Sequence, residues 1–333
     1  MQPAIGKGDV SLDVNPKDIK KSDKGLGIKP RKRFWKTFKE QKLLYMMSLP
    51  FVAWVIVFKY VPLWGWTMAF QNYQPERSFW EQEWVGLDHF IELFQDDRFY
   101  LALRNTLAMS IMGLIVGFIV PIIFAILLNE VRLKFFKRTI QTVSYLPHFV
   151  SWVVAAGIVT KMLSIDGIVN DLLMKLDIVD KPIQFMANGK IIFWIIVTLS
   201  DLWKEMGWNS IIFLAAIVGI DPQLYEAAKV DGASRLRQIW HITLPGMTPT
   251  IIVLLVLSIG HLISIGFEKQ FLLGNPLVID YSEVLDLYAL NYGIGLGRFS
   301  YGTAVGIFNS AMSIILLLLA NRLSKKFTNQ SVI

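Results

Sequence analysis

The chain has 333 residues, 54% of them hydrophobic, with a mean hydropathy of +0.47 and a formal net charge of +7. This composition argues against an ordinary soluble domain and favours an integral membrane protein, and the absence of cysteine excludes disulfide bonds and thiolate metal sites. Residues 1–42 hold twelve Lys or Arg and five acids. They lack the apolar core of a signal peptide, so we expect a basic cytosolic N-terminal tail that contacts membrane lipid rather than nucleic acid.

Six apolar runs follow, each long enough to cross a bilayer as a helix, since about 20 residues span the hydrocarbon core. They are residues 43–69, 105–128, 139–163, 190–219, 247–267 and 301–323. The short alternating segments that are typical of a membrane β-barrel do not occur in the sequence. The sequence therefore predicts an all-α integral membrane fold, with a six-helix transmembrane domain over 43–325 and a short cytosolic tail over 326–333.

The distribution of basic residues orients these helices. With the N-terminus in the cytosol, the segments on the cytosolic side hold 22 Lys or Arg, and those on the opposite side hold eight. The positive-inside rule requires a bias of this sign. We therefore expect both termini and the polar segment 221–246 to face the cytosol.

The polar segment 221–246 separates two very apolar runs and predicts a helical hairpin. Asp221 can cap a helix that begins at Pro222, and Gly232 allows the left-handed turn that ends this helix. Ser234 can cap a second short helix with the sequence RLRQIWHIT. A plain solvated loop is the alternative interpretation of this segment.

The end of the predicted hairpin is marked by Pro245, which is expected to break the chain before the next span. The hairpin would then be a separate element at the cytosolic membrane surface. Its two small alanines, at positions 227 and 228, would permit close approach by another protein. Its acids offer acceptors to a partner's amide or guanidinium groups.

The sequence of this hairpin reads EAA, then two residues, then DGA, and then a spacer that ends in I-x-L-P. It resembles the EAA loop of permease subunits of ABC importers. The matching residues are Glu226, Ala227, Ala228, Asp231, Gly232, Ala233, Ile242, Leu244 and Pro245. The resemblance extends over most of residues 40–325. The stretches YLPHFVSWVV (145–154) and GFEKQFLLGNP (266–276) look like the subgroup that imports oligosaccharides derived from polysaccharides.

The resemblance implies a type I importer fold in the bacterial cytoplasmic membrane, with the hairpin as a coupling helix that docks on a cytosolic ATPase dimer. It also implies a second permease subunit, usually a homologous unlike chain, and an extracytoplasmic solute-binding protein that delivers the oligosaccharide. The chain has no G-x-x-x-x-G-K-[ST] phosphate loop. ATP and Mg would therefore bind to the partner ATPase, and this chain would bind no cofactor. The sequence leaves the choice between a homodimer and a heterodimer open, and also the sugar itself.

The fourth apolar run carries charged residues near its middle, in DLWKEMGWN (201–209). Charges are costly at this depth and usually face a bundle interior or water. They either form a structural ion pair or contribute a polar wall to a translocation path, and His261 of the fifth run either joins that wall or serves in packing. The candidate pathway residues are Asp201, Trp203, Lys204, Glu205, Trp208, Asn209 and His261.

The sequence contains no recognisable catalytic constellation and no histidine pair with metal-ligand spacing, so we expect neither an enzyme nor a metal site. An ion-coupled secondary transporter is the alternative function, with Asp201, Lys204 and Glu205 as a proton or sodium relay. The inverted repeats of many such carriers are not apparent, and the hairpin would have no role in one.

Overall fold

The structure is a computed structural model that describes residues 41–187 and 191–328. The chain divides by its internal contacts into two units, Met1–Trp64 and Gly65–Ile333.

The described part of the first unit is a single helical run. α3 (Lys42–Val55) continues through a π-helical turn, η1 (Ile56–Tyr60), into the 3-10 helix η2 (Val61–Phe70), whose later residues belong to the second unit. The run is long and apolar enough to cross a membrane, in agreement with the first predicted span. The predicted basic tail lies outside the described residues except for its last two positions.

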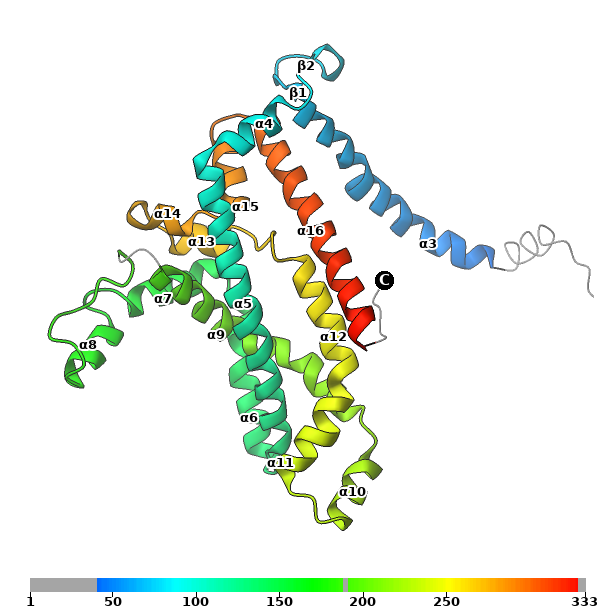
Figure 1. The fold of residues 1–333 in the computed structure, drawn as a ribbon, viewed down its shortest axis with the longest axis vertical. Coiled ribbons are helices and arrows are strands. Elements are labelled where there is room, and N and C mark those ends of the chain that lie inside the picture. Colours follow the sequence, from blue (N-terminus) through cyan, green and yellow to red (C-terminus); the bar gives the residue numbers. More distant parts are fainter. Residues whose placement is uncertain (1–40, 188–190, 329–333) are drawn as a thin grey trace, which may run out of the picture. The chain divides into compact units, whose positions relative to one another are not determined.

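Four long helices form the frame of the second unit. They are α5 (Asp97–Glu130), α9 (Ile191–Val218), α12 (Leu244–Gly260) and α16 (Phe299–Thr328). α5 packs along α9, and α12 packs along α16 (Figure 1). Buried apolar side chains such as Phe213 and Met247 fill the space where α5, α9 and α12 meet. The frame is therefore held by apolar packing between helices whose sequences are mainly apolar.

The third predicted span, 139–163, is broken rather than continuous. α6 (Lys134–Tyr145) ends two residues before Pro147 and is followed by a 3-10 turn, η4 (Leu146–Phe149), and by α7 (Trp152–Met162). The two parts of this span are bent by 104°. Leu146, directly before the proline, keeps a helical conformation, and the backbone becomes extended only at Val150 and Ser151, where the bend lies.

A glycine on α9 lets this helix approach the end of α6. A β-carbon at Gly207 would lie 2.1 Å from the backbone oxygen of Ser144, which is well inside van der Waals contact. Only a residue without a side chain fits at this position. The broken span and the fourth helix are thus in direct backbone contact.

The described helices include four that are long and apolar enough to span a membrane, or up to six spans if each bent pair counts as one. The second pair joins α9 to α10 (Pro222–Val230) with a bend of 68°. α9 misses the test by itself, since its apolar sequence is interrupted by Asp201, Lys204 and Glu205. The predicted helical membrane fold agrees with this arrangement.

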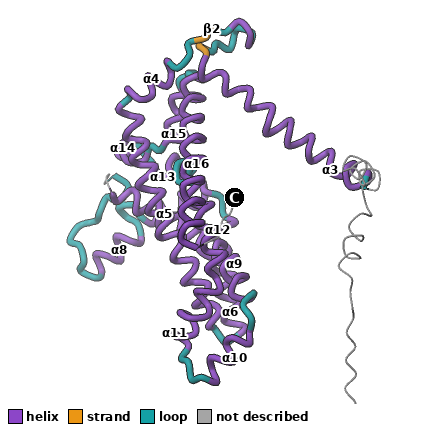
Figure 2. The backbone as a smooth tube through the Cα atoms, turned by 45° about the vertical axis from the view of Figure 1, so that its right-hand side comes forward, coloured by secondary structure: helices purple, strands orange, loops and turns teal. Residues whose placement is uncertain are grey.

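The hairpin elements lie at one end of the second unit and the two short strands at the other (Figure 2). At one end, α10 is followed by α11 (Arg235–Gln238) and a π-helical turn, η5 (Ile239–Thr243). At the other end, β1 (Gln71–Asn72) pairs antiparallel with β2 (Glu83–Trp84), the only strands among the described residues. The other short helices are η3 (Phe79–Glu81), α4 (Asp88–Gln95), α8 (Ile168–Lys175), α13 (Glu268–Leu273), η6 (Pro276–Val278), α14 (Ile279–Ser282), α15 (Leu285–Tyr288) and η7 (Ala289–Gly295).

Candidate functional site

The hairpin between α9 and α12 is built by local hydrogen bonds that its sequence dictates. The carboxylate of Asp221 caps α10 by accepting the amide of Gln223 at 2.9 Å. At the other end of α10, Gly232 has φ +73°. The Gly232 amide donates to the carbonyl of Lys229. The next amide, that of Ala233, donates to the carbonyl of Ala228 at 2.8 Å. This pair of bonds is a Schellman motif, which needs a left-handed residue and therefore favours glycine.

The second helix of the hairpin does not end at Pro245, and the prediction of a break there is wrong. α11, η5 and α12 form one continuous helical run from Arg235 to Gly260. Pro245 lies in the first turn of α12, directly after the π-helical turn. The proline ring would crowd the carbonyl four residues earlier in a regular α-helix, and a wider turn relieves that contact. The second helix of the hairpin is therefore continuous with the fifth span.

Contacts to neighbouring helices hold the base of the hairpin. Arg235 and Glu130, the last residue of α5, form an ion pair with 3.2 Å between nitrogen and oxygen. The hydroxyl of Tyr225 on α10 lies 3.0 Å from that of the buried Thr243. A movement of the hairpin tip would therefore be transmitted to α5 and α12.

The tip of the hairpin is exposed in the second unit. The predicted coupling residues Glu226, Ala227, Asp231 and Gly232 are exposed, and Ala228 and Ala233 are half-buried. Further along the helical run, Ile242 and Leu244 are half-buried and Pro245 is exposed. Two apolar side chains, Val230 and Leu236, are 88% and 68% exposed at the tip. Apolar exposure beside small residues is typical of a surface that another protein covers.

The charged residues in the middle of α9 contact two different parts of the protein. Lys204 is buried, and its ammonium donates to the carbonyl of His148 at 2.8 Å and to Glu205 at 3.0 Å. The other oxygen of Glu205 lies 2.7 Å from Nδ1 of His148. The His148 ring stacks on Trp208 with 4.3 Å between ring centroids. These residues tie α9 to the break of the third span and serve as a structural clamp.

Asp201, one turn earlier, points elsewhere and lines a cavity of about 400 Å³ between α5, α9, α12 and α13. Asn209 and His261 also line this cavity. The carboxylate of Asp201 pairs with the ammonium of Lys269 on α13, at 3.0 Å. Three of the seven candidate pathway residues thus meet at one cavity, where they are joined by a lysine that the sequence analysis did not single out.

Trp203 lies apart from both groups. It lines a separate pocket of about 490 Å³ that is almost entirely apolar, together with residues of α7 such as Ile158. The side chain is 43% exposed. The structure therefore does not bring Trp203 to the polar cavity.

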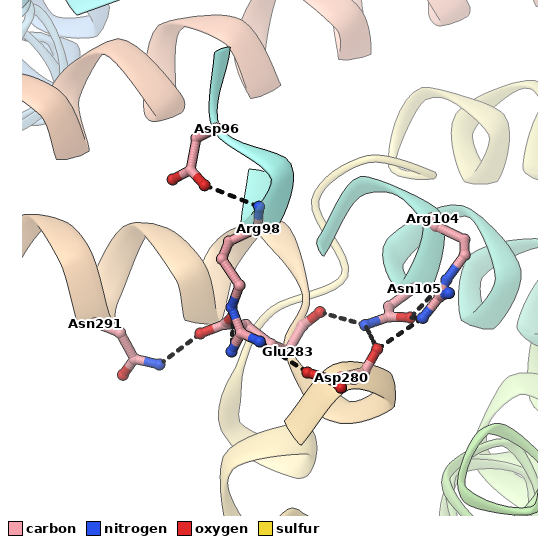
Figure 3. Close-up of polar contacts among 7 residues, drawn as sticks. All are labelled: Asp96, Arg98, Arg104, Asn105, Asp280, Glu283 and Asn291. Carbon is pink, nitrogen blue, oxygen red and sulfur yellow. Dashed lines mark hydrogen bonds and ion pairs between the residues drawn. The ribbon is translucent and has the colours of Figure 1, made fainter. Parts of the chain in front are cut away.

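The segment between α12 and α16, which carries Lys269, is fixed to α5 by a network of polar contacts (Figure 3). Arg98 forms ion pairs with Asp280 at 2.7 Å and with Glu283 at 3.2 Å. Asn105, which is fully buried, donates to the carbonyls of Asp280 and Glu283 at 3.0 and 2.9 Å. Because buried polar groups are satisfied in this way, the segment has a defined position over the cavity.

Two groups in this segment have shifted pKa values. Burial raises the pKa of the Asp286 carboxyl, and hydrogen bonds from the Gly266 amide, Asn309 and Ser264 act in the opposite direction. Burial, with the hydrogen bond to Asp96 as a further cause, also raises the pKa of the Tyr288 hydroxyl. Tyr288 therefore stays neutral and contributes to the fixed attachment of the segment to the start of α5.

The sequence analysis did not predict two residues that contact the charged groups of α9. Both lie in stretches that were noted there only because they resemble the oligosaccharide-importing subgroup. Lys269 belongs to GFEKQFLLGNP, and His148 belongs to YLPHFVSWVV. A charge count within those stretches would have drawn attention to both residues. Their partners on α9 lie 56 to 68 positions away in the chain, and no local periodicity predicts such a pairing.

Comparison with known proteins gives three consistent findings. The family model described as "Binding-protein-dependent transport system inner membrane component" matches residues 117–329. The chain is 46% identical over 305 residues to the polygalacturonan/rhamnogalacturonan transport system permease protein YteP of Bacillus subtilis (strain 168), covering 91% of this chain and 94% of that protein. It is 42% identical to protein LplB of the same organism, covering 88% and 92%.

Solved structures agree with these relatives. A chain from the crystal structure of a bacterial ABC transporter involved in the import of the acidic polysaccharide alginate matches with a TM-score of 0.81 and 41% identity. The match covers 89% of this chain and 99% of that chain. A second structure, of the bacterial alginate ABC transporter with an alginate pentasaccharide-bound periplasmic protein, matches with a TM-score of 0.82 and 40% identity, covering 90% and 100%.

Proposed function

Because the chain belongs to the family of binding-protein-dependent transport system inner membrane components, we propose that it is one of two permease subunits of an ATP-driven oligosaccharide importer. It is a multi-pass protein of the inner membrane with a type I importer fold. The ATPase, the second permease and the binding protein would be separate chains. The hairpin is the single observation that carries the proposal, since it gives an external motor a point of contact.

The mechanics follow from the continuity of the helices. A force on the tip around Gly232 acts on a helical run that extends unbroken from Arg235 to Gly260. That run forms a wall of the cavity that contains Asp201, and the base of the hairpin is tied to α5 through Glu130. A rigid-body shift of the hairpin would therefore tilt two walls of the cavity together. This coupling explains how nucleotide hydrolysis on another chain could open and close the path.

The bias of basic residues supports a cytosolic location for the hairpin and for both termini. The exposed Val230 and Leu236 would then meet the cytosolic ATPase. The opposite end, with β1, β2 and the segment around Arg98, would face the binding protein. The outer segments hold fifteen acids and eight bases, and this balance suits a basic patch on such a partner.

The proposed cargo is an oligosaccharide derived from a polysaccharide. The support is the similarity to a permease named for polygalacturonan and rhamnogalacturonan transport and to an importer of alginate. The cavity adds physical support, since its acid, amide and hydroxyl groups match the hydroxyls of a sugar.

Reconstitution of the natural assembly tests the proposal. The tagged chain is purified from its native membrane and placed in proteoliposomes, and uptake of labelled oligogalacturonate is measured with and without ATP on the hairpin side. We expect a nucleotide-binding subunit and a second permease to purify with the chain, and uptake to require ATP. A solitary chain whose uptake collapses with the ion gradient would instead support the secondary transporter.

A pair of charge reversals serves as the matched control. Glu226→Lys at the hairpin is expected to abolish stimulated ATPase activity, because a basic side chain would meet the surface that the acid normally contacts. Lys326→Glu, a charge reversal at an exposed position at the end of α16 and outside the hairpin, is expected to leave the stimulation unchanged. Equal activity of the two variants would contradict the coupling role of the hairpin.

A further inference from the structure

The stretch GFEKQFLLGNP has a defined conformation that holds Lys269 at the cavity wall. Gly266 has φ +76°, and its amide donates to the carboxylate of Asp286 at 2.7 Å. Gln270, the residue after the lysine, is fully buried. With its flanks fixed on both sides, the lysine has only 19% of its side chain exposed. Its ammonium is therefore presented to one place, the cavity, rather than to open solvent.

The cavity combines this ammonium with neutral polar groups. Asn209, Ser258 and Thr198 all line it together with Asp201. The Thr198 hydroxyl is buried, and it has no hydrogen-bond partner among the residues that the structure describes. A buried hydroxyl without a partner is costly, so a ligand group that pairs with it would gain affinity.

The wall of the cavity that α5 forms contains two glycines and leaves space beside them. Gly113 and Gly117 line the cavity, and a β-carbon added at either one would meet nothing within 4 Å. These glycines therefore do not mediate close helix packing within this chain. They leave room in a cavity whose volume, about 400 Å³, lies within the usual range for small-molecule sites.

The chemistry of the Asp201–Lys269 pair distinguishes between kinds of sugar. Removing the charge of a lysine from water is costly, and neutral hydroxyls can be bound by amides and carboxylates alone. A carboxylated sugar, in contrast, needs a cation. In the structure Asp201 is the counter-ion of Lys269, and the two charges compensate each other. When a sugar carboxylate takes the place of Asp201 on the ammonium, the aspartate is free to accept ligand hydroxyls.

We propose that Lys269, Asp201 and Thr198 form a carboxylate subsite for uronate residues in the translocation cavity, with Asp201 as the resident counter-ion that the sugar displaces. The inference rests on the proposed function and names its substrate class as acidic oligosaccharides. Lys269 recognises the carboxylate, whereas Asp201 and Thr198 bind the hydroxyls of the same sugar.

The test compares an acid with its neutral ester in the reconstituted complete assembly, with saturating binding protein and ATP. The probes are labelled trigalacturonate and its methyl ester. Lys269→Gln is expected to raise the KM for trigalacturonate by about tenfold or more, because a charge-assisted contact is lost. The ester should be affected much less, and Lys269→Arg should retain most of the transport of the acid. Lys161→Gln, which removes a lysine that is 75% exposed and away from the cavity, should have no effect.

A double variant separates binding from a structural role. If the ion pair only holds the helices together, Asp201→Asn with Lys269→Gln leaves a neutral pair and should restore transport of trigalacturonate. The subsite predicts that the double variant stays defective for the acid. Restored transport, or equal losses for acid and ester, would overturn the subsite while uptake by the wild type still supports the importer. A wild-type assembly without ATP-dependent uptake of either probe would overturn both proposals.

Discussion

Replacement of Gly232 by alanine tests the hairpin with a perturbation whose size can be worked out. The residue has φ +73°, and a β-carbon there would meet nothing within 4 Å. The substitution therefore causes no clash, and its cost is the backbone cost of a left-handed L-residue, about 1–2 kcal/mol. That energy lowers the ratio of the native turn to other conformations of this segment about 5- to 30-fold.

Two readouts report this loss in the purified assembly. If docking requires the native turn, the affinity for the ATPase subunit and the substrate-stimulated ATPase activity should both fall, by up to the same factor. Both quantities should fall less in Gly232→Asn, because asparagine tolerates the left-handed region. For the affinity for the ATPase subunit, Gly86→Ala is the matched control, since Gly86 has φ +64° and equally open surroundings at the opposite end of the unit. Unchanged coupling in Gly232→Ala, or an equal loss in Gly86→Ala, would refute the reasoning.

Three further predictions concern the frame that supports the cavity. Gly207→Ala should lower the stability by about 1–3 kcal/mol through its contact with Ser144, whereas Gly113→Ala should not, as thermal unfolding in detergent can check. Lys204→Met should cost about 1.5–3 kcal/mol, because the His148 carbonyl loses its charged donor; a melting temperature equal to that of the wild type would contradict the clamp. The raised pKa of Asp286 means that the folded state binds more protons than the unfolded state above about pH 4. Stability should therefore fall as pH rises through the interval up to the folded pKa, and Asp286→Asn should remove that slope in a melting series across pH; an identical slope in the variant would contradict the burial of this carboxyl.

Local signals allowed much of this structure to be predicted from the sequence. Apolar runs of spanning length locate the helices, and Asp221, Gly232 and Ser234 mark the turns of the hairpin. These features depend on backbone chemistry within a few residues. The prediction failed at Pro245 because a π-helical turn can absorb a proline that would otherwise end a helix.

The arrangement of the polar groups depends on contacts between distant parts of the chain and could not be predicted. The sequence placed Asp201, Lys204 and Glu205 together on α9, yet one residue faces the cavity and two face the break at His148. The three residues lie within about 100° of arc on the helix. What separates them is the neighbour that each meets along the helix axis, Lys269 for Asp201 and His148 for the other two. The attachment of Arg98 to Asp280 spans 182 positions and has no local signature.

Cysteine labelling of the hairpin tip tests the central claim most directly, because the chain contains no native cysteine. Val230→Cys introduces one thiol at a position that is 88% exposed, and Asp166→Cys introduces another at an exposed position on the predicted outer side. The account predicts that a membrane-impermeant maleimide labels position 230 only in inverted vesicles and only after the ATPase is stripped away, and that it labels position 166 only in right-side-out vesicles. Labelling of position 230 from the outside, or labelling that the ATPase does not reduce, would contradict the claim that this hairpin receives the force of nucleotide hydrolysis.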